Sequence, residues 1–175
     1  MNHQTTLYFL RSSEQYIVNK MLSYAYRLEE MHEDPAKVEA LKIFTEFYGF
    51  TNKDLGLYLM SDNEVAGAIW SRKLNNGKIP TISLAVLPQH RRKGYATLML
   101  EQFLLEAAAL YDALDVELIE ESFVQEIYKK FGFIQLDYEG KSLVDGKKTI
   151  KLRRQLERAE PARPSDGYDP RRWMD

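Results

Sequence analysis

The sequence predicts a mixed α/β fold, with a central twisted mixed sheet flanked by helices. Strand-type and helix-type hydrophobic patterns alternate along the chain in the order β-α-α-β-β-β-α-β-α-β-β. A strand, a glycine-containing turn and a long amphipathic helix follow one another over residues 81–105. With 175 residues, the chain is long enough for one domain with its own hydrophobic core.

The first third of the chain predicts one strand and two helices. The β-branched and aromatic residues from Thr6 to Arg11 favour a strand. Ser12 and Gln15 are spaced as a capping box, and the helix after them is expected to extend to about Glu30. A second helix should bury Val38, Leu41, Phe44 and Tyr48 and end at Gly49.

The middle of the chain predicts a hairpin, a further strand and a long helix. Strands at Leu55–Met60 and Val65–Arg72 flank a turn at residues 61–64. The turn signal Asn75-Asn76-Gly77 leads into a strand from Ile79 to Leu87. The helix after residue 94 carries a core-facing stripe, formed by Leu100, Phe103, Leu104, Ala107, Ala108 and Tyr111.

The last third predicts a strand, a short helix and a closing hairpin. The strand covers Asp115–Glu120, and the helix Phe123–Phe131 is ended by Gly132. Strands Ile134–Tyr138 and Thr149–Arg154 should pair with each other. We expect the domain to occupy residues 1–155, and the proline-containing residues 156–175 to form a mobile tail.

Composition narrows the class of protein. A net charge of −2 gives no basic footprint for a nucleic acid. The absence of cysteine excludes disulfides and thiolate metal sites, and it fits a cytoplasmic location. His3, His32 and His90 are scattered, so no metal is expected. The first residues lack a signal-peptide pattern and no apolar run has membrane-spanning length, so no membrane partner is expected.

The turn at residues 91–96, RRKGYA, combines three cationic residues with a helix N-terminus. Unpaired amides and the positive end of the helix dipole favour an anion there, and Gly94 lets the backbone approach a phosphate closely. A P-loop would need Gly-Lys-Ser/Thr, and a dinucleotide fingerprint would need further glycines. The remaining pattern is [QR]-x-x-G-x-[GA], directly after a strand.

This pattern resembles the acetyl-CoA signature of the GCN5-related N-acetyltransferase (GNAT) family. The segment Tyr128–Phe133, YKKFGF, is similar to a second family motif, and Gly67-Ala68-Ile69-Trp70 matches a softer third one. The resemblance covers roughly residues 5–154. It implies the acyl-CoA N-acyltransferase fold and acetyl-CoA as a co-substrate, with no metal.

The resemblance also implies roles for particular residues. The general acid that returns a proton to the departing CoA thiolate is expected at Tyr128. The family's asparagine six or seven residues earlier is replaced here by Ser122 and Glu121. Backbone groups would bind the pantetheine arm at Leu84, Ala85 and Val86, and the pyrophosphate at Arg91, Arg92, Lys93, Gly94, Tyr95, Ala96 and Thr97.

The general base is left open by the sequence. The strand that precedes the turn contains no carboxylate, so Glu117 and Glu120 on the next strand are the available acids. Ser83 is a candidate for holding a catalytic water, whereas His90 is expected on the surface.

The acceptor is expected to be a small-molecule or peptide amine. Aromatic residues of the first half would line its side of the site, and the acidic residues Glu29, Glu30, Glu33 and Asp34 would attract a cation. A homodimer stays open. So do two non-enzymatic alternatives with the same fold, a catalytically silent CoA-binding module and a protein-interaction module.

Overall fold

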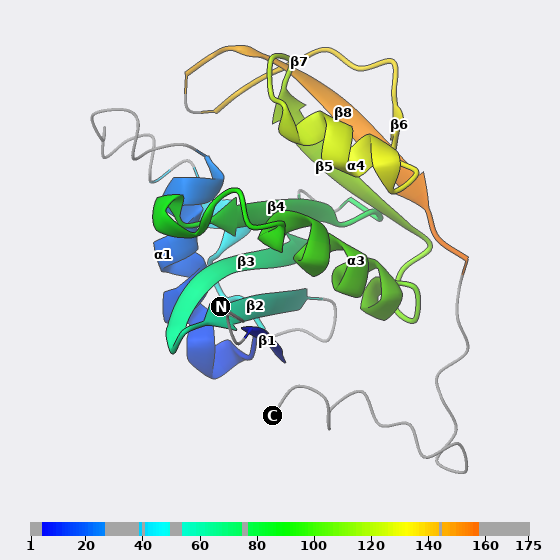
Figure 1. The fold of residues 1–175 in the computed structure, drawn as a ribbon. Coiled ribbons are helices and arrows are strands. Elements are labelled where there is room, and N and C mark those ends of the chain that lie inside the picture. Colours follow the sequence, from blue (N-terminus) through cyan, green and yellow to red (C-terminus); the bar gives the residue numbers. More distant parts are fainter. Residues whose placement is uncertain are drawn as a thin grey trace.

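One open sheet of eight strands organises the molecule, in the order β1-β2-β3-β4-β5-β8-β6, with β7 paired to β8 (Figure 1). The computed structural model describes residues 5–26, 39, 41–49, 54–74, 77–143 and 145–157. The strands are β1 Thr5–Phe9, β2 Leu55–Ser61, β3 Glu64–Arg72, β4 Thr81–Val86, β5 Ala113–Ile119, β6 Ile134–Gln135, β7 Gly140–Lys141 and β8 Lys148–Gln155. The mixed α/β fold is confirmed.

Helices cover both faces of this sheet. They are α1 Gln15–Ala25, α3 Tyr95–Ala107 and α4 Val124–Lys130, with short 3-10 turns η1 Ser12–Glu14, η3 Lys42–Phe44 and η4 Pro88–His90. In Figure 1, α3 and α4 lie in front of the sheet and α1 lies behind it. No helix among the described residues is both long and apolar enough to cross a bilayer.

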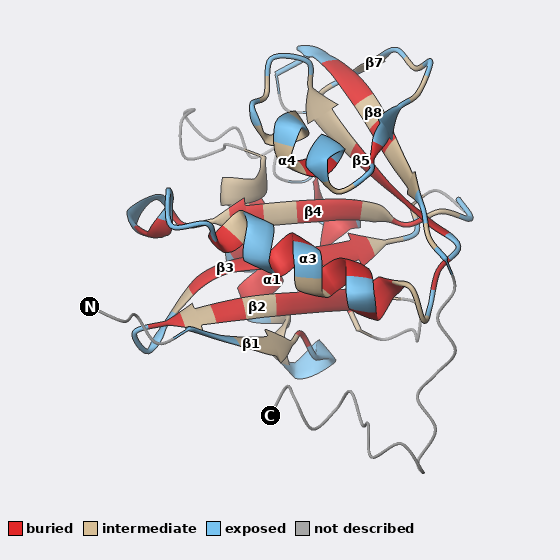
Figure 2. Cartoon of the chain, turned by 45° about the vertical axis from the view of Figure 1, so that its right-hand side comes forward, coloured by how far each residue is buried: buried red, intermediate tan, exposed pale blue. Residues whose placement is uncertain are grey.

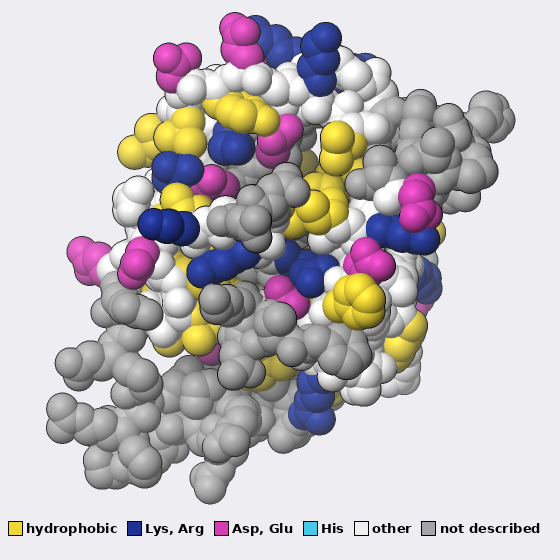
Figure 3. Space-filling model, turned by 180° about the vertical axis from the view of Figure 1, so that it is seen from behind, with side chains coloured by type: hydrophobic (Ala, Val, Ile, Leu, Met, Phe, Trp, Pro, Cys, Tyr) yellow, Lys and Arg dark blue, Asp and Glu magenta, His cyan; other side chains and the backbone are white. Residues whose placement is uncertain are grey.

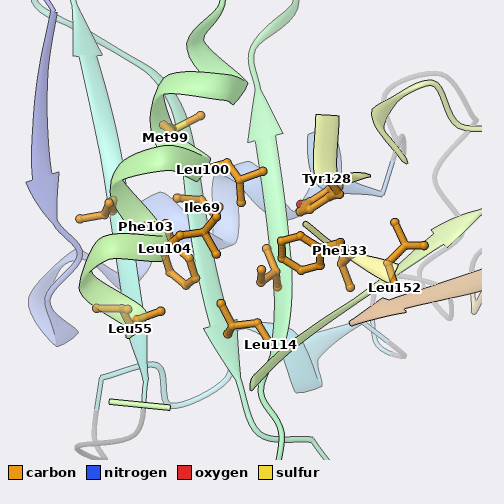
Figure 4. Packing of buried hydrophobic residues seen from close by; sticks show 14 of the residues in the cluster. Leu55, Ile69, Met99, Leu100, Phe103, Leu104, Leu114, Tyr128, Phe133 and Leu152 are labelled. Carbon is orange, nitrogen blue, oxygen red and sulfur yellow. The ribbon is translucent and has the colours of Figure 1, made fainter. Parts of the chain in front are cut away.

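The two faces have separate hydrophobic cores. Figure 2 shows in red the buried parts of the strands and helices. The larger core packs α3 and α4 against the sheet through residues such as Phe103, Leu114 and Tyr128 (Figure 4). The smaller core packs α1 and the segment around η3 through Met21, Tyr48 and others. Alternate residues of each strand therefore belong to different faces, which decides what can meet at the site.

Strands β1 to β4 form an antiparallel meander. The local predictions hold for the turn between β2 and β3, for the apolar stripe of α3 and for the end of α4. The turn between β2 and β3 has Asp62 and Asn63 at φ values of 51° and 67°, as a tight hairpin requires. Four of the six predicted helix-stripe residues, Leu100, Phe103, Leu104 and Ala107, are buried within α3, and Tyr111 is buried just after it. Gly132, at φ +87°, ends α4 as expected.

The first helix is capped differently from the prediction. The carboxylate of Glu14 accepts a hydrogen bond from the Arg11 amide at 3.1 Å, so the cap lies before η1 and not at Ser12 and Gln15. Helix α1 ends at Ala25, and the predicted continuation to Glu30 lies outside the described residues.

The second predicted helix is wrong over residues 41–49. Residues 41–49 form turns around the short 3-10 turn η3. Arg72 holds this segment by donating to the carbonyls of Ile43 and Glu46, and it pairs with the buried Asp54 at 3.3 Å. The Trp70 indole donates to the Phe44 carbonyl at 2.9 Å, so long-range contacts replace the local helix bonds.

The closing hairpin is shorter than predicted. Only Ile134–Gln135 pairs with β8, and the additional strand β7 joins β8 further along. β8 pairs with β5 from Ala113 opposite Gln155 to Ile119 opposite Thr149. The predicted tail lies almost entirely outside the described residues, and the domain boundary at 155 remains a prediction.

Candidate active site

The sheet opens between its two central parallel strands. The register pairs β4 with β5 at one position only, Thr81 opposite Asp115, where the Asp115 amide donates to the Pro80 carbonyl at 2.9 Å. Beyond that pair the two strands have no further register partners, although both continue toward their carboxyl ends. A gap therefore separates β4 from β5 and joins the two faces of the sheet.

Part of the β4 backbone is free to bind a ligand in this gap. The Leu87 amide donates to Ala66 of the β3 side at 2.8 Å, whereas the Pro80 carbonyl faces β5. Because backbone groups alternate in direction along a strand, Ile82, Leu84 and Val86 face the gap. The expectation for Ala85 changes, since its backbone faces β3, although the residue lines the cavity.

A cavity of about 1340 Å³ occupies the gap and its surroundings. This volume exceeds the roughly 300–1,000 Å³ of typical small-molecule pockets, so it has room for a long ligand and a second one. β4, β5, the turn before α3, the start of α4 and the end of α1 all contribute to its lining. Within the described part of the chain, no cluster of metal-ligating side chains exists.

The N-terminus of α3 opens at one end of this cavity. The first bond within the helix runs from the Leu98 amide to the Gly94 carbonyl at 3.1 Å, so the amides of residues 95–97 lie ahead of the helical ladder. No side chain caps this end. Arg91 and Arg92 border the cavity and are exposed. The arrangement suits an anion.

Gly94 has the conformation that this turn requires. Its φ is +78°, and a Cβ built on it would have no other atom within 4 Å, so the space beside it is open. Tyr95 fixes the beginning of the helix, because its hydroxyl is 2.8 Å from Ser61 Oγ at the end of β2. Lys93 does not border the main cavity, and instead lines a small neighbouring pocket.

Tyr128 lies on the α3 side of the gap. It is 1% exposed, lines the cavity and packs edge-on against Phe133, with 5.1 Å between ring centroids (Figure 4). The backbone of α4 holds it there, since the Phe133 amide donates to the Tyr128 carbonyl at 3.2 Å. Burial raises the pKa of its phenol, and nearby Tyr26 raises it further, so the group keeps its proton.

Ser83 and Glu117 lie on the opposite face of the sheet, where α1 ends. Ser83 Oγ is hydrogen-bonded to the Tyr26 hydroxyl at 3.2 Å. Glu117 accepts hydrogen bonds from Tyr138 and from Thr149, each at 2.8 Å. Burial raises the pKa of Tyr26, and the Glu117 charge adds to this, while the Ser83 hydrogen bond acts against it.

The two predicted candidates for the base are thus separated by the structure. Glu117 lines the cavity, whereas Glu120 does not and instead lies 3.9 Å from Lys148 on the exposed surface. The expectation that His90 is a surface residue is wrong, because it is 6% exposed and its Nε2 lies 3.2 Å from Glu64.

Sequence reasoning missed the surroundings of Glu117. Tyr26, Tyr138 and Thr149 come from three distant segments, and nothing local indicates that they meet. One signal was present, since Thr149, Lys151 and Arg153 alternate with the apolar residues Ile150 and Leu152 in β8. That alternation places the three polar residues on one face.

A sheet split between parallel strands, with an open helix N-terminus at the mouth of the split, defines the class of acyl-CoA N-acyltransferase folds. Solved structures of this class are similar to the chain. An acetyltransferase of the GNAT family from Streptococcus pneumoniae superposes with a TM-score of 0.66 at 13% identity, over 87% of this chain and 99% of that one.

Two further structures of known specificity show the same fold. Spermidine N-acetyltransferase from Vibrio cholerae, in complex with CoA and spermine, has a TM-score of 0.64 at 14% identity, covering 89% of this chain and 97% of that one. The ribosomal-protein-S18-alanine N-acetyltransferase from Escherichia coli has a TM-score of 0.63 at 15% identity, covering 91% and 99%. No curated protein matches the sequence significantly.

The sequence itself matches the family model of the acetyltransferase (GNAT) domain over residues 53–135, which include the turn before α3 and Tyr128. This match spans just under half of the chain, and together with the shared fold it confirms the resemblance of the motifs to the GNAT family. The protein is accordingly an enzyme of the N-acetyltransferase class.

Proposed function

We propose that the protein transfers an acetyl group directly from acetyl-CoA to the amine of a small-molecule or peptide acceptor. The opening between β4 and β5 is the observation that carries this proposal. It leaves backbone groups of β4 free, ends at an uncapped helix N-terminus and connects two faces, so that two substrates approach from opposite sides. With no cysteine in the sequence, no cysteine-borne acyl-enzyme forms.

On the α3 side, the amides of Gly94, Tyr95, Ala96 and Thr97 bind the pyrophosphate, with Arg91 and Arg92 adding positive charge. Lys93 contributes charge from outside the main cavity. The gap-facing groups of Leu84 and Val86 pair with the pantetheine arm as an added strand would, although Val86 must first give up the Arg91 guanidinium bound to its carbonyl at 3.0 Å.

In the reaction, the acceptor nitrogen attacks the thioester carbon, the C–S bond breaks and the thiolate leaves. A gap-facing amide of β4 stabilises the developing oxyanion. Tyr128 then gives its proton to the thiolate, a task that suits a buried phenol that is still protonated. Glu117 takes the proton that the acceptor ammonium must lose, either directly or through a water held by Ser83.

The experiment that tests cofactor binding is a thermal-shift titration with acetyl-CoA, with CoA and ATP as comparisons. Acetyl-CoA at a hundred times its dissociation constant should stabilise the protein by about 2.7 kcal/mol, a rise of roughly 5–10 °C for a domain of this size. A rise with both CoA ligands but not with ATP supports the proposal. No shift at millimolar acetyl-CoA contradicts it.

Gly94→Ala tests whether the turn itself holds the phosphate. The left-handed conformation should make the substitution cost about 1–2 kcal/mol of stability and weaken acetyl-CoA binding. Gly146→Ala is the matched control, because Gly146 has φ +72° and equally open surroundings but does not line the cavity. It should lose similar stability and keep its affinity for acetyl-CoA.

A second candidate function is a CoA-binding module without catalysis. The feature favouring it is the absence of any carboxylate on β4, Thr81–Val86. Acetyl-CoA binding without thiol release in the presence of an amine panel would support this candidate. An interaction module that binds no CoA would show no thermal shift at all. The homodimer and the cytoplasmic location stay predictions, to be checked by light scattering and by localisation of the tagged protein.

A further inference from the structure

Two rows of charged residues run from strand β5 to strand β8, on the face of the sheet that carries the Ser83 side chain. Each row consists of one acidic residue and one basic residue. Asp115 is the register partner of Arg153, and Glu117 is the register partner of Lys151. Both pairs line the cavity. They share strands, face and charge types, so a difference between them reflects what else contacts them.

The Asp115–Arg153 row is a closed ion pair. Arg153 donates to the carboxylate through Nε at 2.7 Å and through Nη2 at 2.9 Å. The Asp115 side chain is 7% exposed, so its charge is fully compensated by this two-point contact. This row has no charge left to offer a ligand.

The Glu117–Lys151 row is open. Both carboxylate oxygens of Glu117 accept from neutral hydroxyls, Tyr138 on Oε1 and Thr149 on Oε2. Lys151 Nζ lies instead over the ring of Tyr138, 4.2 Å from its centroid. Within the described residues, Lys151 has no carboxylate at ion-pair distance. Tyr138 thus holds an anion by its hydroxyl and a cation by its ring, and the two do not pair with each other.

Each of these charges is half-buried at the cavity wall, where leaving it without an opposite charge costs free energy. A ligand with one positive and one negative charge would give both Glu117 and Lys151 an opposite charge to pair with. Charges of both signs are also interspersed on the surface seen from behind in Figure 3, with no single sign covering it. A polycationic acceptor would meet only one member of the row favourably.

Resting on the proposed function, we propose that the acceptor is a small zwitterionic amino compound, with an anionic group such as a carboxylate close to its amine. Its ammonium binds Glu117 and its anionic group binds Lys151, after which Glu117 takes the ammonium proton. As cross-strand partners, the two residues have Cα atoms about 5 Å apart, which suits the short separation of charges in an amino acid.

Matched acceptors test the proposal by thiol release from acetyl-CoA. The panel is a set of L-amino acids, their carboxamides and the corresponding decarboxylated amines, for example phenylalanine, phenylalaninamide and phenethylamine. The expected result is at least a tenfold higher kcat/KM for one or more free acids than for their own amide and amine. Equal or better use of the amides and amines, which lack the carboxylate, would overturn the proposal.

Lys151→Met should then raise KM for the free acids at least tenfold and abolish the preference over the amides, while acetyl-CoA affinity stays the same. Lys148→Met is the control on the same strand, because Lys148 points to exposed Glu120 and does not line the cavity. A preference that survives Lys151→Met overturns the assignment of that residue.

The two levels of proposal fail separately. If acetyl-CoA binds but no acid in the panel is acetylated, the zwitterion assignment falls and acetyl-CoA binding stands. If acetyl-CoA does not bind at all, the proposed function falls first. Lys151→Arg, which keeps the charge, should restore much of the preference for the acids, and a failure to restore it would indicate a packing role instead.

Discussion

The Tyr128 side chain belongs to the hydrophobic core and also reaches the cavity of the candidate active site. Its ring belongs to the core between α4 and the sheet, whereas its hydroxyl has no hydrogen-bond partner among the described residues and lies at the cavity. A hydroxyl that the fold leaves unpaired is available to a substrate. Its removal should therefore cost the fold little.

Tyr128→Phe should lower kcat by about 10²–10⁴-fold, the usual contribution of a general acid, with the acetyl-CoA dissociation constant unchanged. Thiol-release kinetics and a thermal-shift titration measure the two quantities. Tyr111→Phe removes another buried hydroxyl, away from the cavity, and should leave kcat as it is. Full activity of Tyr128→Phe would remove this residue from the mechanism.

Glu117→Gln should lower kcat by at least about 10²-fold, because the amide cannot accept the acceptor's proton. Glu120→Gln is the comparison that separates the two sequence candidates, since Glu120 does not line the cavity. We expect its kcat to match the wild type. A loss in Glu120→Gln with none in Glu117→Gln would reverse the assignment.

Among the elements, the pairing of β5 with β8 matters most for the site. Beyond Asp115, which is opposite Thr81, strand β5 has no register partner on β4. Along the gap, β5 is therefore held by its pairing with β8. The Asp115–Arg153 ion pair lies at the position where the gap begins. It stabilises the wall on which Glu117 stands.

Asp115→Asn should destabilise the fold by about 2–3 kcal/mol, because it removes a charge-assisted two-point contact and leaves Arg153 at the cavity without its partner. Urea unfolding measures this change. The surface pair of Glu120 and Lys148 provides the contrast, and Glu120→Gln should change stability by no more than about 0.5 kcal/mol. Similar losses of stability in both variants would show that the buried ion pair contributes no more stability than the surface pair.

At the scale of the whole molecule, several buried tyrosines link stability to alkaline pH. Burial raises the pKa of Tyr111 to about 12, and it also raises the pKa values of Tyr26, Tyr48 and Tyr128. These phenols release protons more readily in the unfolded chain than in the folded one. The folded state therefore binds more protons above pH 10, and its stability falls as the pH rises.

Unfolding by urea should thus become easier between about pH 10 and pH 12. Tyr111→Phe should remove about 2 kcal/mol of the pH dependence between pH 8 and pH 11.5, since most of the shift of the Tyr111 pKa from 10.0 to about 12 takes effect by pH 11.5. Unfolding free energies measured at pH 8 and pH 11.5 test this. An unchanged difference between the two pH values in the variant would contradict the assignment to Tyr111.

The sequence alone determined the features that depend on neighbours along the chain. The turn at residues 91–96 and helix α3 follow from a glycine that must adopt positive φ and from a regular apolar stripe. The β2–β3 hairpin and the end of α4 at Gly132 have equally local causes. The family motifs lie within these segments, which is why the fold and the class of enzyme were predictable.

The tertiary structure decided which side chains meet. Residues 41–49 do not form the expected helix, because Arg72 and Trp70 bind their carbonyls from another part of the chain. Tyr26 reaches Ser83 across 57 positions, and Thr149 reaches Glu117 across 32. Contacts of this kind depend on how the strands pair and on where the sheet parts, and no periodicity along the chain encodes either.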